Sequence, residues 1–139
     1  MSVLLDAFAL IALLAGEPAA DGVEAILRRG EAAITAINLA EVLDVLERVE
    51  GIPADRLDAL TGPLIEESMT LIPVDERLAR RAAALRARYY HRTRAPVSLA
   101  DCVLIAAAAS MDALATADRA VIGIARTEDI SVIDLAGGS

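Results

Sequence analysis

The sequence predicts an α/β protein in which helices cover both faces of a mainly parallel sheet of four to five strands, a three-layer α/β/α arrangement. Short apolar runs alternate with longer amphipathic stretches along the whole chain. Several of the short runs are too apolar to alternate, which is typical of strands covered on both faces. The length of 139 residues fits one domain with one core, so we expect a single domain over residues 1–139.

Five runs have the character of strands, and helical stretches separate them. The strands are expected at 2–5 (SVLL), 32–35 (AAIT), 69–74 (MTLIPV), 112–116 (DALAT) and 130–135 (ISVIDL). The apolar stripes of 39–49 and 78–89 indicate two of the helices. The predicted order β-α-α-β-α-α-β-α-α-β-α-β implies right-handed crossovers between parallel strands.

Charge and composition exclude several classes of function. The net charge of −8 repels phosphate backbones, so chemistry on nucleic acid needs a bridging cation. All 13 basic residues are arginine, and without lysine a P-loop, a Schiff base and lysine-dependent phosphate chemistry are excluded. The single Cys102 excludes a disulfide framework and a multi-cysteine metal site.

The apolar runs are short for a membrane protein. The longest, 7–15 and 102–109, cannot span a bilayer, and neither is flanked like a signal peptide. We therefore expect a cytoplasmic protein that does not associate with membranes.

Four acidic residues are expected at one rim of the sheet, because ligands collect at the carboxyl ends of parallel strands. Asp6 follows the first strand directly, and Glu41 lies about one helical turn after the second. Asp101 opens the helix before the fourth strand, and Asp118 follows that strand. Asp112 begins the fourth strand and is expected at the opposite end.

Each acid also has a purely structural interpretation. The segments NLAE (38–41) and SLAD (98–101) have the form of capping boxes, and Asp6, Asp118 and Asp75 can be helix N-caps. The four rim acids together favour a site, since they would repel one another unless a divalent cation neutralised them. Hard oxygen ligands suit Mg²⁺ or Mn²⁺.

Four segments resemble the signature segments of PIN-domain nucleases, and their order and spacing are similar to those of the VapC toxins of bacterial toxin–antitoxin operons. They are VLLDAFALIALLAGEP, ITAINLAEVLDVLER, PVSLADCVLIAAA and DALATADRAV. The resemblance implies that Asp6, Glu41, Asp101 and Asp118 hold Mg²⁺ or Mn²⁺ and activate water for attack on an RNA phosphodiester. It also implies a homodimer and a cognate antitoxin protein that blocks the site.

Some positions depart from this family or stay open. Phe8 stands where family members often carry a serine or threonine, and Thr116 matches a position that often has a hydroxyl. Asn38 is expected to cap its helix, although it can also contact the site. The arginine-rich run 77–94, with Tyr89 and Tyr90, can contact RNA or form a solvated helix end, and His91 is expected to belong to that polar end.

Two alternatives to a toxin stay open at this point. A housekeeping RNA-processing enzyme would share the fold and the acidic site, whereas a catalytically silent scaffold would use the fold only to bind proteins. The complete set of four acids argues against the scaffold. A phosphatase is disfavoured by the missing lysine and by the absence of an Asp-x-Asp motif.

Overall fold

Within residues 1–136, seven helices and five strands alternate in the predicted order. The computed structural model describes residues 1–136, so the last three residues of the predicted domain 1–139 lie outside the described residues. The elements are β1 (Val3–Leu5), α1 (Ala7–Ala15), α2 (Ala20–Arg28), β2 (Ala32–Thr35), α3 (Ala36–Arg48), α4 (Ala54–Ser68), β3 (Met69–Ile72), α5 (Glu76–Tyr89), α6 (Leu99–Ala108), β4 (Ala113–Thr116), α7 (Arg119–Thr127) and β5 (Val132–Asp134).

The strands form one parallel sheet in the order β3-β2-β1-β4-β5. Strand β1 is central, with Leu4 paired to Ala33 of β2 and to Leu114 of β4. All three residues of β1 are buried, as the apolar run predicted. The parallel arrangement confirms the predicted fold class and brings the carboxyl ends of β1, β2 and β4 to the same edge.

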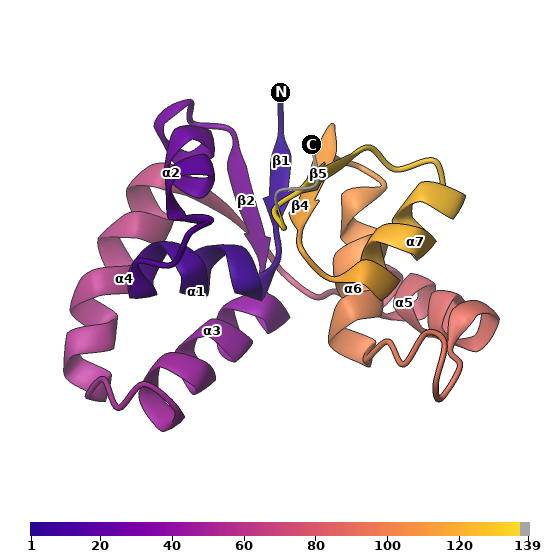
Figure 1. Cartoon of the computed structure of the whole chain (residues 1–139), viewed down its shortest axis with the longest axis horizontal. Coiled ribbons are helices and arrows are strands. Elements are labelled where there is room, and N and C mark those ends of the chain that lie inside the picture. The colour runs from indigo at the N-terminus through magenta and orange to yellow at the C-terminus, as the bar shows by residue number, and fades with distance from the viewer. Residues whose placement is uncertain (137–139) are drawn as a thin grey trace.

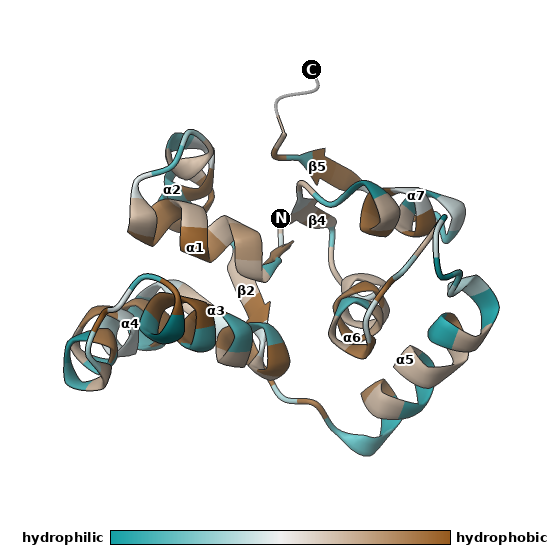
Figure 2. Cartoon of the chain, turned by 60° about the horizontal axis from the view of Figure 1, so that its bottom comes forward, coloured by the Kyte–Doolittle hydropathy of each residue, from teal (hydrophilic) through white to brown (hydrophobic). Residues whose placement is uncertain are grey.

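Helices cover the sheet on both faces, which completes the three layers (Figure 1). Helices α1 to α4 lie on one side and α5 to α7 on the other. Successive side chains of β1 point to opposite faces of the sheet and belong to different core clusters. Val3 and Leu5 share a cluster with Val23 of α2, whereas Leu4 shares one with Leu104 of α6. Apolar residues are concentrated in the strands, α1 and α6, whereas α5 carries many hydrophilic positions (Figure 2).

Several predicted boundaries differ from the observed ones for local reasons. Strand β3 ends at Ile72, before Pro73, whose nitrogen cannot donate to a neighbouring strand. Asp112 lies just before β4, where its carboxylate accepts hydrogen bonds from the backbone and hydroxyl of Ser2. Gly16 ends α1 in the left-handed conformation, at φ 68°, which glycine adopts without steric cost.

Two negative predictions of the sequence can be compared with the fold. In the part of the chain that the structure describes, no helix is both long and apolar enough to cross a membrane. Cys102 is buried in the cluster between the sheet and α6, where its thiol packs as a small apolar group.

We expect the central strand to be far more sensitive to truncation than the edge strand. Leu4→Ala removes a fully buried side chain and should lower the free energy of unfolding by about 2–5 kcal/mol. Leu71→Ala in β3 removes a side chain that is 44% exposed and should change it by less than about 1 kcal/mol. Urea unfolding of both variants measures the difference, and equal losses would contradict the burial of β1.

Candidate active site

The structure brings the four predicted acids together around one cavity. Asp6 lies between β1 and α1, Glu41 on α3, Asp101 in the first turn of α6, and Asp118 between β4 and α7. All four line a cavity of about 350 Å³, together with Ala7, Phe8, Asn38, Leu104 and Ala117. Asp112 is outside this lining, as its place at the start of β4 predicted.

Three of the four acids accept hydrogen bonds from backbone amides at the start of a helix while they line the cavity, Asp6 and Asp118 as N-caps and Asp101 as the acid of a capping box. The Asp6 Oδ1 atom accepts from the Ala9 amide at 2.8 Å, and the Asp118 Oδ1 atom accepts from the Val121 amide at 3.0 Å. Asp101 forms a complete capping box with Ser98, in which both bonds measure 3.0 Å. The capping and cavity-lining interpretations therefore hold for the same residues.

Helix α3 begins at Ala36, earlier than the sequence indicated, so Asn38 lies inside the helix and is not its N-cap. Thr35, the last residue of β2, is the N-cap, because its hydroxyl accepts from the Asn38 amide at 3.1 Å. The segment NLAE is thus not a capping box, and the prediction that Asn38 caps the helix is wrong. The strand runs directly into the helix, so a residue of the strand provides the cap.

Asn38 instead connects the strand end to Glu41. Its side chain is 2% exposed, accepts from the Thr35 hydroxyl at 2.8 Å, and donates to Glu41 Oε1 at 2.8 Å. Spacings of three residues place Thr35, Asn38 and Glu41 on one side of the first turns of α3. That spacing is the sequence signal that could have indicated this contact.

Thr116 contacts two of the acids from the end of β4. It is fully buried, its hydroxyl donates to Asp6 Oδ2, and its oxygen accepts from the Asp118 amide at 3.2 Å. The sequence left open whether Thr116 belongs to the site. In the structure it positions the carboxylate of Asp6, which lies 110 residues away along the chain.

Burial and mutual repulsion change the proton affinity of two acids. Burial raises the pKa of Asp6 to about 6, against the hydrogen bonds from Thr116 and Ala9, which lower it. The negative charges of Asp118 and Asp101 raise the same pKa further. Burial and the charge of Asp101 also raise the pKa of Glu41, although the Asn38 amide opposes this. The acids therefore affect one another electrostatically.

The donor chemistry of the cavity fits a hard divalent cation. Its polar lining consists of four carboxylates and one amide, and no basic side chain among the described residues lines it. The nearby Arg119 is paired with Asp134. Within residues 1–136 no three acidic, histidine or cysteine side chains already have the arrangement of a metal centre, and the carboxylates are instead turned toward their caps and Asn38. Carboxylates of this kind suit Mg²⁺ or Mn²⁺.

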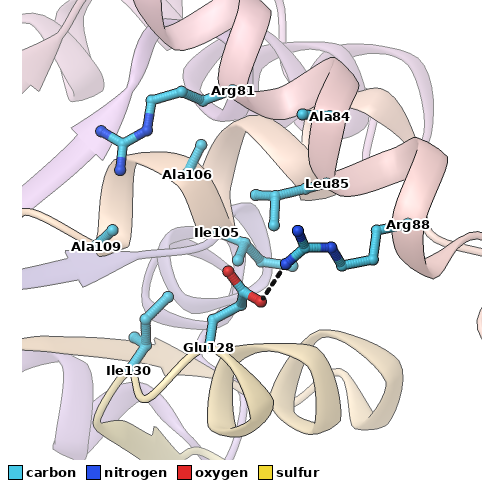
Figure 3. A pocket seen from close by; sticks show the side chains of 9 residues that line it. All are labelled: Arg81, Ala84, Leu85, Arg88, Ile105, Ala106, Ala109, Glu128 and Ile130. Atoms are coloured by element: carbon cyan, nitrogen blue, oxygen red, sulfur yellow. Dashed lines mark hydrogen bonds and ion pairs between the residues drawn. The ribbon is translucent and has the colours of Figure 1, made fainter.

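The arginine-rich run lies on another part of the surface. Arg81 and Arg88 of α5 line a second cavity with Leu85 and Glu128, and Arg88 lies 3.4 Å from the Glu128 carboxylate (Figure 3). None of the residues of this run lines the acidic cavity in the described part of the chain. RNA contact by this run stays a prediction.

The aromatic and histidine side chains of this run interact within the chain. The Tyr89 hydroxyl donates to Glu128, and the Arg86 guanidinium lies 4.6 Å from the centre of the Tyr90 ring. His91 pairs with Ala95 through the backbone, and its Nδ1 atom accepts from the Arg94 amide at 3.1 Å. His91 thus belongs to the polar end after α5, as expected.

Comparison with solved structures identifies proteins of the same fold. A toxin–antitoxin complex from Klebsiella pneumoniae aligns with a TM-score of 0.65 and 23% identity over 96% of this chain and 98% of that chain. FitAcB from Neisseria gonorrhoeae aligns with a TM-score of 0.65 and 23% identity over 97% and 99% of the two chains. VapBC2 from Rickettsia felis, bound to a promoter DNA fragment, has a TM-score of 0.66 and 15% identity over 96% and 98%.

The sequence comparisons give a family. No curated protein matches the chain, but the family model described as PIN domain matches residues 3–129. This segment includes the four acids of the cavity and Thr116. The chain therefore belongs to the PIN domain family.

Proposed function

We propose that this protein is a metal-dependent endoribonuclease that acts in the cytoplasm as the toxin of a toxin–antitoxin pair. The observation that carries the proposal is the convergence of Asp6, Glu41, Asp101 and Asp118, from four separate parts of the chain, on one cavity. Membership of the PIN domain family and the resemblance of the four sequence segments to VapC toxins support it. The similar folds of toxin–antitoxin complexes support it as well.

The four acids are proposed as the ligands of Mg²⁺ or Mn²⁺. When bound, the cation supplies a water of lowered pKa and screens the charge that develops on the scissile phosphate. Thr116 and the Ala9 amide fix both oxygens of Asp6, and Asn38 fixes one oxygen of Glu41. The caps of Asp101 and Asp118 each use one carboxylate oxygen, so the second oxygen of each can face a ligand.

The same acidic cavity accounts for the proposed partners. A basic side chain of an antitoxin can enter a cavity lined by four carboxylates and take the place of the cation. We propose that an antitoxin segment binds as a helix in a groove and that the protein forms a homodimer, as the resemblance implies. The RNA is the substrate, and the cation offsets the net charge of −8 that would otherwise repel it.

Cleavage of total RNA by the purified protein tests the proposal directly. We expect cleavage with Mn²⁺, none with EDTA, and a loss of more than about 100-fold for Asp101→Asn and Asp118→Asn, since each removes a negative ligand. Asparagine is a good N-cap in place of Asp118, and its side-chain oxygen can still accept from the Ser98 amide in place of Asp101, so both variants should stay folded.

Asp75→Asn is the matched control for this experiment. Asp75 caps α5 by accepting from the Leu78 amide at 2.8 Å, as Asp118 caps α7, but it does not line the acidic cavity. Its replacement should leave cleavage intact. If wild type cleaves no RNA while it binds a partner protein tightly, the protein is a scaffold and the acids serve only as caps.

The buried carboxylate of Asp6 should make the metal-free protein less stable at neutral pH. Its pKa rises from an ordinary value of 3.8 to about 6, so the folded state binds this proton more tightly than the unfolded state. The contribution of Asp6 to the free energy of unfolding therefore falls as pH rises from about 4 to about 6, by at most about 3 kcal/mol.

Asp6→Asn removes this titration and keeps an N-cap. In EDTA the variant should be more stable than wild type near about pH 7, and the advantage should shrink near about pH 4 as Asp6 becomes protonated. Urea unfolding of both proteins at the two pH values measures this. An advantage that does not change with pH would show that the carboxylate is not desolvated.

Removal of the Thr116 hydroxyl should weaken metal binding without removing a proposed ligand. Thr116→Val deletes the hydrogen bond that lowers the pKa of Asp6, so a cation must compete with a more tightly held proton. We expect Mn²⁺ affinity to fall by about tenfold, and its dependence on pH to move to higher pH. Titration calorimetry with Mn²⁺ measures both.

Thr61→Val is the control for the loss of a buried hydroxyl. Thr61 is 4% exposed and donates to the Leu57 carbonyl within α4, away from the acids. Its replacement should leave Mn²⁺ affinity unchanged. Equal losses in the two variants would mean that Thr116 acts only through general stability.

A further inference from the structure

Phe8 is an exposed aromatic side chain on the wall of the acidic cavity. It is the single phenylalanine of the chain and lies two residues after Asp6, in the first turn of α1. Its side chain is 40% exposed and lines the same cavity as the four carboxylates. The most apolar ring in the protein therefore lies beside the most acidic group of residues.

The fold does not use this ring to build its core. Ala9 and Leu10, which follow Phe8 in α1, are fully buried in two of the core clusters. Phe8 belongs to none of the three clusters found among the described residues. Burial of a phenylalanine side chain is strongly favourable. A partly exposed Phe8 therefore contributes less to the stability of the fold than a buried phenylalanine would.

The other two aromatic side chains, Tyr89 and Tyr90, already interact with residues of this chain. The Tyr89 hydroxyl binds Glu128, and Arg86 lies over the ring of Tyr90. Tyr89 is the last residue of α5 and Tyr90 follows it, and neither lines the acidic cavity. Phe8 is thus the aromatic residue placed to meet whatever binds at the acids.

The chemistry of the cavity favours a nucleobase as the group that meets this ring. The carboxylates attract a cation and, through it, a phosphate, but they offer no apolar surface for the flat face of a base. An aromatic face stacks on any base, and this attraction does not depend on charge. A base can stack in this way only when it is unpaired, because a paired base in a helix keeps its neighbours on both faces.

We propose that Phe8 stacks against an unpaired base of the RNA next to the phosphate bound at the acids, and so restricts the substrate to single-stranded or looped segments. This inference rests on the proposed nuclease function. It assigns to Phe8 the positioning of the substrate and leaves the activation of water to the acidic site.

The test combines substitutions at Phe8 with RNA that lacks one base. The probe is a single-stranded RNA oligonucleotide copied from the main cut in total RNA, with an abasic nucleotide at each position around the cut in turn. Phe8→Ala and Phe8→Leu should lower kcat/KM on the intact RNA by about fivefold to a hundredfold, mainly through KM, whereas Phe8→Trp should retain it. Leucine keeps an apolar side chain but has no aromatic ring. A loss of activity in Phe8→Leu that Phe8→Trp does not show would therefore mean that the aromatic ring is required.

The abasic RNA distinguishes stacking from a structural effect. At one position next to the cut, removal of the base should lower wild-type cleavage by the same factor and have no further effect on Phe8→Ala. Leu60→Ala is the control for loss of an exposed apolar side chain, because Leu60 is 44% exposed on α4 and outside the cavity. Its cleavage should equal that of wild type.

Different results overturn this inference and the proposed function. If wild type cleaves RNA but the effects of Phe8→Ala and of every abasic position are independent, the stacking is wrong and the nuclease stands. If Phe8→Ala cleaves RNA normally but no longer binds a co-purified antitoxin, the stacking is also wrong and the nuclease stands. Phe8 would then contact the antitoxin and not the RNA.

A binding measurement keeps the inference testable without cleavage. A single-stranded RNA with 2-aminopurine beside the expected phosphate should lose fluorescence when it binds Asp101→Asn, and the quenching should disappear when Phe8→Ala is added. RNA that binds without this difference overturns the stacking. RNA that wild type neither binds nor cleaves overturns both proposals.

Discussion

The parallel pairing of β1 between β2 and β4 is the constraint on which the rest of the structure depends. Because the three strands run in the same direction, the chain leaves each of them at the same edge of the sheet. Helices on both faces exclude water up to this edge, so Asp6, the residue directly after β1, is only 7% exposed. A carboxylate in such a place needs partners. The start of α1 provides an amide, and Thr116 at the end of the neighbouring strand provides a hydroxyl.

The same hydrogen bonds maintain the fold and shape the site. Helix N-termini offer free amide groups and a positive end of the helix dipole, which stabilise the carboxylates of Asp6, Asp101 and Asp118. These contacts reduce but do not cancel the cost of burial, since the pKa of Asp6 stays at about 6. Acids that cap helices are therefore not excluded as metal ligands. Their caps fix the direction of each carboxylate before any ligand binds, which lowers the entropic cost of binding.

The distribution of charge separates the acidic cavity from the basic surface. Arginines of α2, α3 and α5 form exposed ion pairs with acids one turn earlier, such as Arg28 with Glu24 and Arg48 with Asp44. Exposed pairs of this kind contribute little stability, but each places a negative charge beside its arginine. No basic side chain in residues 1–136 lines the cavity. A cation is thus the group best suited to offset the acids, and among residues 1–136 Phe8 is the one aromatic side chain that lines the cavity.

The sequence by itself determined the order of strands and helices and the caps formed by Ser98 and Asp75, because periodicity and capping are properties of neighbouring residues. It also placed the four acids near one rim, since strand direction follows from the alternation of strands and helices. Only the tertiary structure decided the strand order, the direction of Glu41 and the contact between Thr116 and Asp6. These depend on how helices pack across the sheet and join residues far apart in the chain. The error at Asn38 has the same origin, because the buried end of β2 provides the cap that the local pattern assigned to Asn38.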